Sequence, residues 1–309
     1  MSTANLRNAV PFDRILVPYD GSEPARAALT YALAFGRVGS AIDVVNVVDE
    51  VGTLASPTVA MATVLQQRRR LERGRELLAI AKRRCRRAGI ESTIELLRGA
   101  PVPAIIAAAQ AKGSHLILLG THGRTGLRRL VLGSVTEGVL RAGAVPMLAV
   151  RSPLRRPARR LFQRILAAVD DAEPSDAAAS LAGDLSRALS AACVFAHVID
   201  AKDAAAKAAR FGYDLSSFID VIGAHGTEIV EHARARSGLG DSAVTAIVKG
   251  KPVPGILQEA DRTGADAIVI GSHGRRGLQR FFLGSVAEKV LRASELPVFV
   301  VRCARTCSS

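Results

Sequence analysis

The sequence predicts an α/β protein of two tandem domains, each a five-stranded parallel sheet with helices on both faces. Short apolar segments alternate with helical patterns along the chain, and strands separated by helices need crossover connections that make a sheet parallel. The motif G-x2-G-x9-G-S occurs twice, at 120–134 and 271–285. Strand and turn sequences also repeat at an offset of 150 residues at Asp20/Asp170, and the length of 309 residues by itself favours about two domains.

The first half begins with an apolar run over residues 12–20, followed by a turn and an alanine-rich helix through Phe35. Residues 50–63 show no clear period and are expected to form a mobile connection. The expected strands that follow are 43–49, 92–98, 116–119 and 147–150, and the expected helices are 64–88, 104–112 and one from Ser134. The helix over 64–88 should place Leu65, Leu71, Leu78 and Ile80 on one side and many arginines on the other.

The second half repeats this order after a basic segment. Residues 151–164 contain two prolines and six arginines without apolar periodicity, which indicates a solvated linker. The later strands are expected at 165–170, 192–200, 244–248 and 298–301. We assign the first domain to 1–152, the linker to 153–161, the second domain to 162–304 and a tail to 305–309.

Composition narrows the class of protein. No apolar run approaches the ~18 residues that span a bilayer, and residues 1–10 lack the apolar core of a signal peptide, so a soluble cytoplasmic protein without a membrane partner is expected. The four scattered cysteines indicate neither a zinc site nor a disulfide framework. A formal charge of +14 would attract any polyanion, including nucleotides, nucleic acid and membrane phosphates.

Each glycine motif follows a strand and precedes a helix that starts at Ser134 or Ser285. Clustered glycines allow backbone N–H groups to approach a ligand, and a helix start supplies unpaired donors and a positive dipole. That chemistry favours an anion such as phosphate. The alternative is that the glycines only shape a tight turn and the serine only caps the helix. Because both copies keep their glycines at identical offsets, we favour anion binding.

Both halves resemble the universal stress protein family. The shared features are an ILVPxD-like first strand, a G-x-P turn before the third helix, a G-(T/S)-H-G-R loop, an LGS helix start and a P-(V/M)-x-V-V-R-like last strand. The resemblance covers about 11–152 and 161–303. It implies a Rossmann-like, adenine-nucleotide-binding fold, and the loop G-x2-G-x9-G-(S/T) marks members of the family that bind ATP.

The resemblance also implies a nucleotide site in each half. Asp20 and Asp170 match the family's acidic residue beside adenosine, and Val47 and Val198 match the position that packs on adenine. Loop residues would hold the ribose and phosphates, with or without Mg²⁺ bound through the phosphates. The expected contacts are Pro18, Asp20, Val47, Gly120, His122, Gly123, Arg124, Gly133 and Ser134 in the first half, and Asp170, Val198, Gly271, His273, Gly274, Arg275, Gly284 and Ser285 in the second.

The second half departs from the pattern after its first strand. It lacks the equivalents of Pro18 and of the Gly21-Ser22 turn, and it carries an extra carboxylate, Asp171, that would repel phosphate if it faced the site. The first site is therefore the stronger expectation. The two halves are expected to pair within the chain through edge strands at 147–150 and 298–301, and a homodimer is an alternative.

Little chemistry on the nucleotide is expected. The chain lacks a P-loop G-x4-G-K-(S/T) and lacks the S-G-G-x-D-S type loop of adenylating enzymes, so any ATP hydrolysis should be slow. His122 and His273 could carry protons, but no carboxylate lies at short spacing, and a role in a turn or at a phosphate is favoured. Arg124 and Arg275 suit the outer phosphates and equally suit a solvated loop.

The arginine run from Arg68 to Arg87 raises a second class of function, the binding of nucleic acid or an acidic partner. No aromatic residues interleave with these arginines to stack on bases. A solvated helix face is the common outcome for such a run, and we favour it over a nucleic acid partner. The sequence thus predicts an ATP-binding regulatory or stress-survival factor whose protein partner is unknown.

Overall fold

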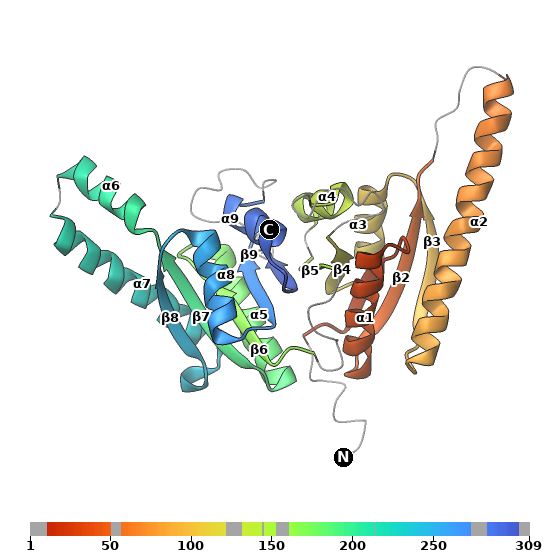
Figure 1. Cartoon of the computed structure of the whole chain (residues 1–309). Coiled ribbons are helices and arrows are strands. Elements are labelled where there is room, and N and C mark those ends of the chain that lie inside the picture. Colours follow the sequence, from red (N-terminus) through yellow and green to blue (C-terminus); the bar gives the residue numbers. More distant parts are fainter. Residues whose placement is uncertain are drawn as a thin grey trace, which may run out of the picture. The chain divides into compact units, whose positions relative to one another are not determined.

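The computed structural model describes residues 11–50, 57–121, 132–143, 145–152, 161–212, 214–272 and 283–302. The chain divides into two compact units, unit 1 at Met1–Arg159 and unit 2 at Arg160–Ser309. Each unit is an α/β domain, as the sequence predicts, and each is described below by itself (Figure 1).

Unit 1 alternates strands and helices. Its strands are β1 (Arg14–Pro18), β2 (Ala41–Val48), β3 (Ser92–Arg98), β4 (Leu116–Gly120) and β5 (Met147–Val150). They pair in parallel in the order β3-β2-β1-β4-β5. Its helices are α1 (Glu23–Arg37), α2 (Pro57–Arg87), α3 (Pro101–Ala111) and α4 (Ser134–Ala142).

The strand order fixes which face each helix covers. The chain moves through α1 and α2 toward one edge of the sheet, and then through α3 and α4 toward the other. Because parallel crossovers are right-handed, the two pairs cover opposite faces. Arg84 of α2 donates to the carbonyl of Arg26 in α1 (3.3 Å), and a Cβ on Gly138 of α4 would lie 2.5 Å from Val102 of α3, so the helices of each pair touch.

Unit 2 repeats this architecture. Its strands pair in parallel in the order β10-β9-β6-β7-β8. They are β6 (Arg164–Ala168), β7 (Ala192–Ile199), β8 (Val244–Lys249), β9 (Ala267–Gly271) and β10 (Val298–Val301). The helices are α5 (Glu173–Leu189), α6 (Ala201–Phe211), α7 (Leu215–Ser237), α8 (Pro252–Thr263) and α9 (Ser285–Ala293), with a 3₁₀ turn at Gly240–Ser242.

Aliphatic strands and capped helices explain these elements. Four consecutive residues of β1, 15–18, are buried, as expected for a strand covered on both faces. Ser22 caps α1 by accepting from the N–H of Ala25 (3.3 Å), and Pro24 lies in the first turn, where a missing N–H costs nothing. The edge-to-face pair of Phe12 and Phe35 packs the start of β1 against α1.

Two sequence expectations for the long helices were wrong, and one helix was not anticipated. Helix α2 begins at Pro57, so residues 57–63 are helical and do not belong to an irregular connection. Leu65 and Ile80 are 53% and 40% exposed, because the buried row of α2 follows Gly74, Leu78, Ala81 and Cys85. Helix α6 was not expected at all, since its alanine-rich sequence has no strong apolar period.

The described part of the chain contains no helix that is both long and apolar enough to cross a membrane. Nor does it contain a cluster of metal-ligating side chains, and its two cysteines, Cys85 and Cys193, are free and buried. The thiols of this part of the chain therefore belong to the two cores.

Candidate functional site

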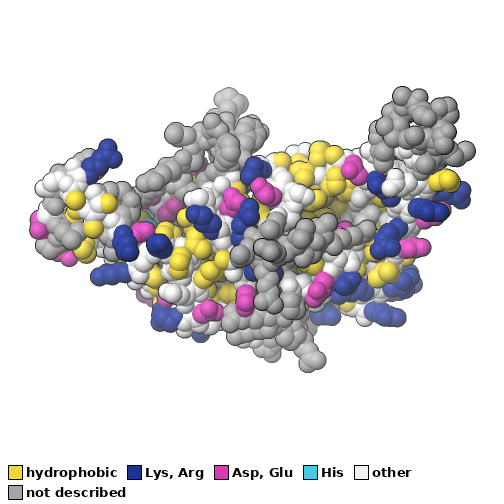
Figure 2. All heavy atoms as spheres, turned by 45° about the horizontal axis from the view of Figure 1, so that its top comes forward, with side chains coloured by type: hydrophobic (Ala, Val, Ile, Leu, Met, Phe, Trp, Pro, Cys, Tyr) yellow, Lys and Arg dark blue, Asp and Glu magenta, His cyan; other side chains and the backbone are white. Residues whose placement is uncertain are grey.

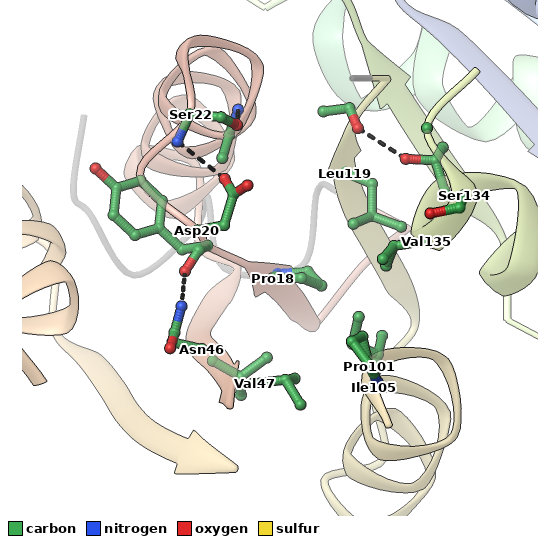
Figure 3. A pocket seen from close by; sticks show the side chains of 16 residues that line it. Pro18, Asp20, Ser22, Asn46, Val47, Pro101, Ile105, Leu119, Ser134 and Val135 are labelled. Carbon is green, nitrogen blue, oxygen red and sulfur yellow. Dashed lines mark hydrogen bonds between the residues drawn. The ribbon is translucent and has the colours of Figure 1, made fainter. Parts of the chain in front are cut away.

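In unit 1 the sheet order reverses between β1 and β4. The chain runs from β1 toward β2 on one side, and from β4 toward β5 on the other. The connections that leave the carboxyl ends of β1 and β4 therefore run in opposite directions. Such a switch point leaves a crevice that is the usual ligand position in open α/β sheets. A pocket of about 210 Å³ lies there, lined from β1, β2, β4, α3 and α4 (Figure 3).

The end of β1 forms one side of this pocket. Tyr19 is held at both backbone groups: its N–H donates to the carbonyl of Val45 (2.7 Å), and its carbonyl accepts from Nδ2 of Asn46 (2.7 Å). The Asp20 carboxylate accepts from the N–H of Ser22 (2.9 Å), so it is fixed at the start of α1 (Figure 3). The turn thereby presents an oriented carboxylate to the pocket.

Val47 presents its backbone N–H and C=O, as well as its side chain, to the pocket. Successive residues of a strand direct their N–H and C=O groups to opposite neighbours, so alternate residues face the same neighbour. Val45 accepts from Tyr19 on the β1 side, whereas Val48 accepts from the N–H of Gly99 on the β3 side (3.1 Å). Val47 therefore faces the β1 side, beyond the last paired residue of β1, Pro18. Its adjacent donor and acceptor lie at the pocket, which Val47 lines.

Gly120 lines the pocket at the end of β4, where no larger residue fits. A Cβ on this residue would lie 2.5 Å from the backbone carbon of Pro24 and 2.8 Å from the nitrogen of Ala25. The end of β4 and the start of α1 thus pack backbone to backbone. This glycine is required by the close approach of β4 to α1, whereas the sequence interpretation concerned the approach of backbone N–H groups to a ligand.

The start of α4 supplies donors. Gly133 is its N-cap and makes no side-chain cap, so the first-turn amides of Ser134, Val135 and Thr136 have no side-chain partner from the cap residue. Gly133 is itself fixed by its N–H, which donates to the carbonyl of Thr121 (2.7 Å). Ser134, Val135 and Thr136 all line the pocket, so the positive end of the helix dipole meets it.

The apolar wall comes from residues that the sequence analysis did not assign to the site. Pro101 and Ile105 of α3 and Leu119 of β4 line the pocket, as do Asn46 and Ser22 (Figure 3). The repeated G-x-P turn before the third helix was the available signal for Pro101. Ile105 and Leu119 carry no signal in the sequence, because apolar residues of a helix and a strand read as core.

The structure brings together six of the expected first-half residues, Pro18, Asp20, Val47, Gly120, Gly133 and Ser134, around the one pocket. His122, Gly123 and Arg124 lie outside the described residues, as do His273, Gly274 and Arg275.

Unit 2 keeps the same backbone scheme. Val169 donates to the carbonyl of Ala196 (2.9 Å), which places the N–H and C=O of Val198 on the β6 side beyond that strand. A Cβ on Gly271 would lie 3.0 Å from Pro174. Gly284 is the N-cap of α9 and donates to the carbonyl of Ser272 (2.7 Å), and Ser285 begins that helix.

The side chains around the unit 2 site differ. Asp170 accepts from Oγ of Ser175 (2.5 Å) and from the N–H of Ala172 (3.1 Å). In the place of Asn46, His197 uses Nδ1 to contact the carbonyl of Val169 (2.8 Å). Asp171 lies 3.7 Å from Nε2 of His225 in α7, so the extra carboxylate is drawn to that helix.

Comparisons with known proteins agree with this fold. The model of the universal stress protein family matches residues 11–151 and 161–302. Universal stress protein MJ0531 of Methanocaldococcus jannaschii is 35% identical over 146 residues, which is 46% of this chain and 84% of that protein. A universal stress protein of Mycolicibacterium smegmatis is 26% identical over 305 residues, covering 93% of this chain and 96% of the other.

A solved structure extends the likeness to three dimensions. The crystal structure of a universal stress protein from Archaeoglobus fulgidus has a TM-score of 0.65 and 26% identity. It covers 94% of this chain and 96% of its own. The similarity therefore spans both units.

Proposed function

The chain belongs to the universal stress protein family, and we propose that it binds ATP at the carboxyl edge of each sheet and acts as a regulatory or stress-survival factor. The family membership supports the stress-response role. The observation that carries the nucleotide proposal is the pocket of unit 1, because residues from four separate segments that the glycine motif and the resemblance singled out meet there.

The lining of this pocket fits an adenine nucleoside. Val47 and Ile105 offer an apolar wall for a purine ring, and the N–H and C=O of Val47 offer the donor and acceptor that a purine edge can pair with. The oriented carboxylate of Asp20 can accept a hydrogen bond from a ribose hydroxyl. No basic side chain among the lining residues would compete for that carboxylate.

The opposite end of the pocket fits phosphate. The first turn of α4 from Ser134 directs backbone N–H groups and a positive dipole to it, which is the arrangement that binds phosphate at helix starts. We propose that Gly123, His122 and Arg124 complete this end, with Gly274, His273 and Arg275 in the same roles in unit 2. Mg²⁺, where present, would be held through the phosphates.

ATP hydrolysis should be slow. The pocket places one carboxylate, Asp20, and it is engaged by the N–H of Ser22 at the start of α1, away from the phosphate end at α4. Its part is to position the ribose, so we assign no catalytic residue.

Isothermal titration of the full chain with ATP tests the proposal. Val47→Phe should fill the apolar end of the unit 1 pocket and remove one binding event, with a loss of affinity of about 100-fold at that site. Val198→Phe is the matched control in unit 2 and should leave the unit 1 event unchanged. Both side chains sit at equivalent strand ends, so circular dichroism should show equal folding of the two variants.

Absence of ATP binding by the wild-type chain would reject the proposal. If ATP binds with unchanged affinity to both valine variants, a nucleotide site exists elsewhere and the strand-end assignment is wrong.

A further inference from the structure

The outward face of α2 carries a long stripe of cations. The helix contains ten Lys or Arg and two Glu over Pro57–Arg87. Nine of its basic residues are exposed, and the tenth, Arg84, turns toward α1 and donates to Oγ1 of Thr30 (2.9 Å). Figure 2 shows dark-blue Lys and Arg side chains gathered on the surface of unit 1 around α2.

Most of the exposed cations of α2 form no ion pair with other described residues. Among described residues, Arg68 is paired with Glu72 (3.0 Å), but no ion pair holds the exposed arginines at six other positions of the helix. Those six are Arg69, Arg73, Arg75, Arg83, Arg86 and Arg87. The like charges at these positions repel one another along the helix, and no ion pair with a described residue offsets that repulsion. Ion pairing therefore gives these arginines no stabilising part in α2.

Unit 2 supplies an internal comparison, because α7 occupies the equivalent place on its sheet. Gly74 of α2 and Gly226 of α7 are both pressed against the second and third strands. An added Cβ would lie 2.6 Å from Leu96 in the first case and 3.2 Å from Ile199 in the second. The two helices therefore align at these glycines.

With that alignment, α7 has no basic stripe. It contains two Arg and three Asp or Glu over Leu215–Ser237. The positions of Arg69, Arg73 and Arg75 are filled by Val221, His225 and Thr227, all exposed. The same helix on the same kind of sheet thus forms without the arginines.

The stripe has the dimensions of a linear polyanion site. At about 100° per residue, Arg68, Arg75, Lys82 and Arg86 form one row, and Arg69, Arg73, Arg83 and Arg87 form a second beside it. The helix keeps them on a rigid line of about 27 Å at 1.5 Å per residue, which faces roughly 8 base pairs of duplex at 3.4 Å each.

The side chains also select among polyanions. Nine of the ten basic residues are exposed to solvent, and all but Lys82 are arginines. A guanidinium group pairs with phosphate through two parallel hydrogen bonds. From residue 63 onward, the exposed large apolar residues of this face are Val64, Leu65 and Ile80, and they are split between its two ends, so this described part forms no apolar strip to insert into a lipid layer. Helix α2 contains no aromatic side chain to stack on unpaired bases.

We propose that the outward face of α2 binds double-stranded nucleic acid through its phosphates, without reading the bases. Charge complementarity carries this inference, because two rows of exposed cations along one helix match a rod of closely spaced phosphates. The surface is independent of the nucleotide pocket, so Val47→Phe should bind duplex as the wild type does.

The test is fluorescence anisotropy of the full chain with a labelled 20-base-pair duplex of mixed sequence at 50 to 200 mM salt. The key variant replaces Arg69, Arg73, Arg75 and Arg86 with Gln, which preserves helix propensity. Its matched control replaces Lys202, Arg236, Lys249 and Lys251 of unit 2, all exposed, with Gln and removes the same charge. A third variant carries Lys at the four α2 positions.

The α2 Gln variant should lose at least about 10-fold in affinity at 50 mM salt, and its log–log salt slope should become shallower by up to about 3.6. The unit 2 control should lose less than about 3-fold, and the Lys variant should stay within about 3-fold of wild type. Melting curves check that all variants fold.

Three results would overturn the proposal. The first is no binding of duplex at 50 mM salt. The second is equal loss in the α2 variant and the unit 2 control, which would show that net charge alone attracts the duplex. The third is binding to vesicles containing phosphatidylserine, or to an acidic peptide, that depends on the four arginines while duplex stays unbound.

Discussion

The strand-end sites of the two units share their backbone and differ in their side chains. Gly120 and Gly271 both press the end of one strand against a helix start, and Val47 and Val198 both direct backbone groups beyond the neighbouring strand. Around this common frame, however, Asp170 is engaged by the hydroxyl of Ser175, whereas Ala25 occupies that position beside Asp20.

The difference shows which features of the site the fold imposes. Both units keep the strand order and the close glycine contact, and in unit 1 this arrangement leaves the pocket at the switch point of the sheet. The groups around it are free to change, because the sheet and helices tolerate Asn46 or His197 against the same carbonyl. Asp20 and Asp170 both accept a backbone N–H at the start of the following helix, and Asp170 accepts in addition from the hydroxyl of Ser175. Unit 1, whose pocket brings together six of the expected residues, is therefore the better candidate for a working site.

The largest expected effect concerns the close backbone contact. Gly120→Ala would place Cβ 2.5 Å from the backbone of Pro24, whereas Gly271→Ala would place it 3.0 Å from Pro174. We expect losses of about 3 and about 1 kcal/mol in the free energy of unfolding. Calorimetric unfolding measures both. Gly223→Ala is the control, because a Cβ at Gly223 in α7 meets nothing within 4 Å, and it should be neutral or stabilising. Equal losses for Gly120→Ala and Gly271→Ala would contradict the difference in packing.

The next effect is a pH dependence of the free energy of unfolding that comes from a buried thiol in unit 2. Burial raises the pKa of the Cys193 thiol from its ordinary value of 9.0 to about 12, and the neighbouring Ser186 hydroxyl opposes part of that rise. The thiol of the unfolded chain ionises first, so this stabilisation is complete below pH 9 and is lost as the pH rises toward 12. Ile42 holds the matching place in unit 1, so unit 1 has no thiol at this strand position.

Denaturant unfolding between pH 9 and 10.5 checks this expectation. The wild-type chain should lose about 2 kcal/mol more over that range than Cys193→Ala, at about 1.4 kcal/mol per pH unit. Parallel curves for the two proteins would show that the thiol does not ionise on unfolding in this range.

The smallest effect sharpens the comparison of the two carboxylates. Asp20→Asn should weaken ATP binding to unit 1 by about 10-fold, because the charged acceptor beside the ribose is lost. Asp170→Asn should change binding to unit 2 by less than about 2-fold, since Ser175 already occupies the Asp170 carboxylate. Titration calorimetry of each variant measures both.

Ser175→Ala provides the control for the carboxylate comparison. It places in unit 2 the alanine that unit 1 has at residue 25, and it should make ATP binding to unit 2 sensitive to Asp170→Asn. An insensitive double variant would mean that Ser175 is not what separates the two sites.

Most of the fold could be predicted from the sequence, because buried parallel strands and capped helices leave local signals. Strands β3 and β5 have the predicted bounds, and α4 begins at Ser134 as expected. The start of α2 was missed because Pro57 to Thr63 lack an apolar period, although proline suits a first helical turn. Leu65 and Ile80 were assigned to the wrong side because the buried row of α2 is built from Gly74, Ala81 and Cys85.

The candidate site was only partly predictable. Motif spacing identified Gly120, Gly133 and Ser134, because glycines and helix starts have conformational requirements that a sequence shows. Ile105 reads as an ordinary core residue, and only the packing of α3 beside the end of β2 makes it part of the pocket wall.

The sequence by itself determined the duplication, the parallel α/β class and the glycines at the strand ends, because these follow from periodicity and local backbone preference. Only the tertiary structure decided that Ser175 engages Asp170 and that Val47 faces an unpaired edge, since both depend on which segments the sheet order brings together. It likewise showed that Arg69, Arg73 and Arg75 of α2 are exposed, whereas α7 has Val221, His225 and Thr227 in their place, as the alignment of Gly74 with Gly226 shows.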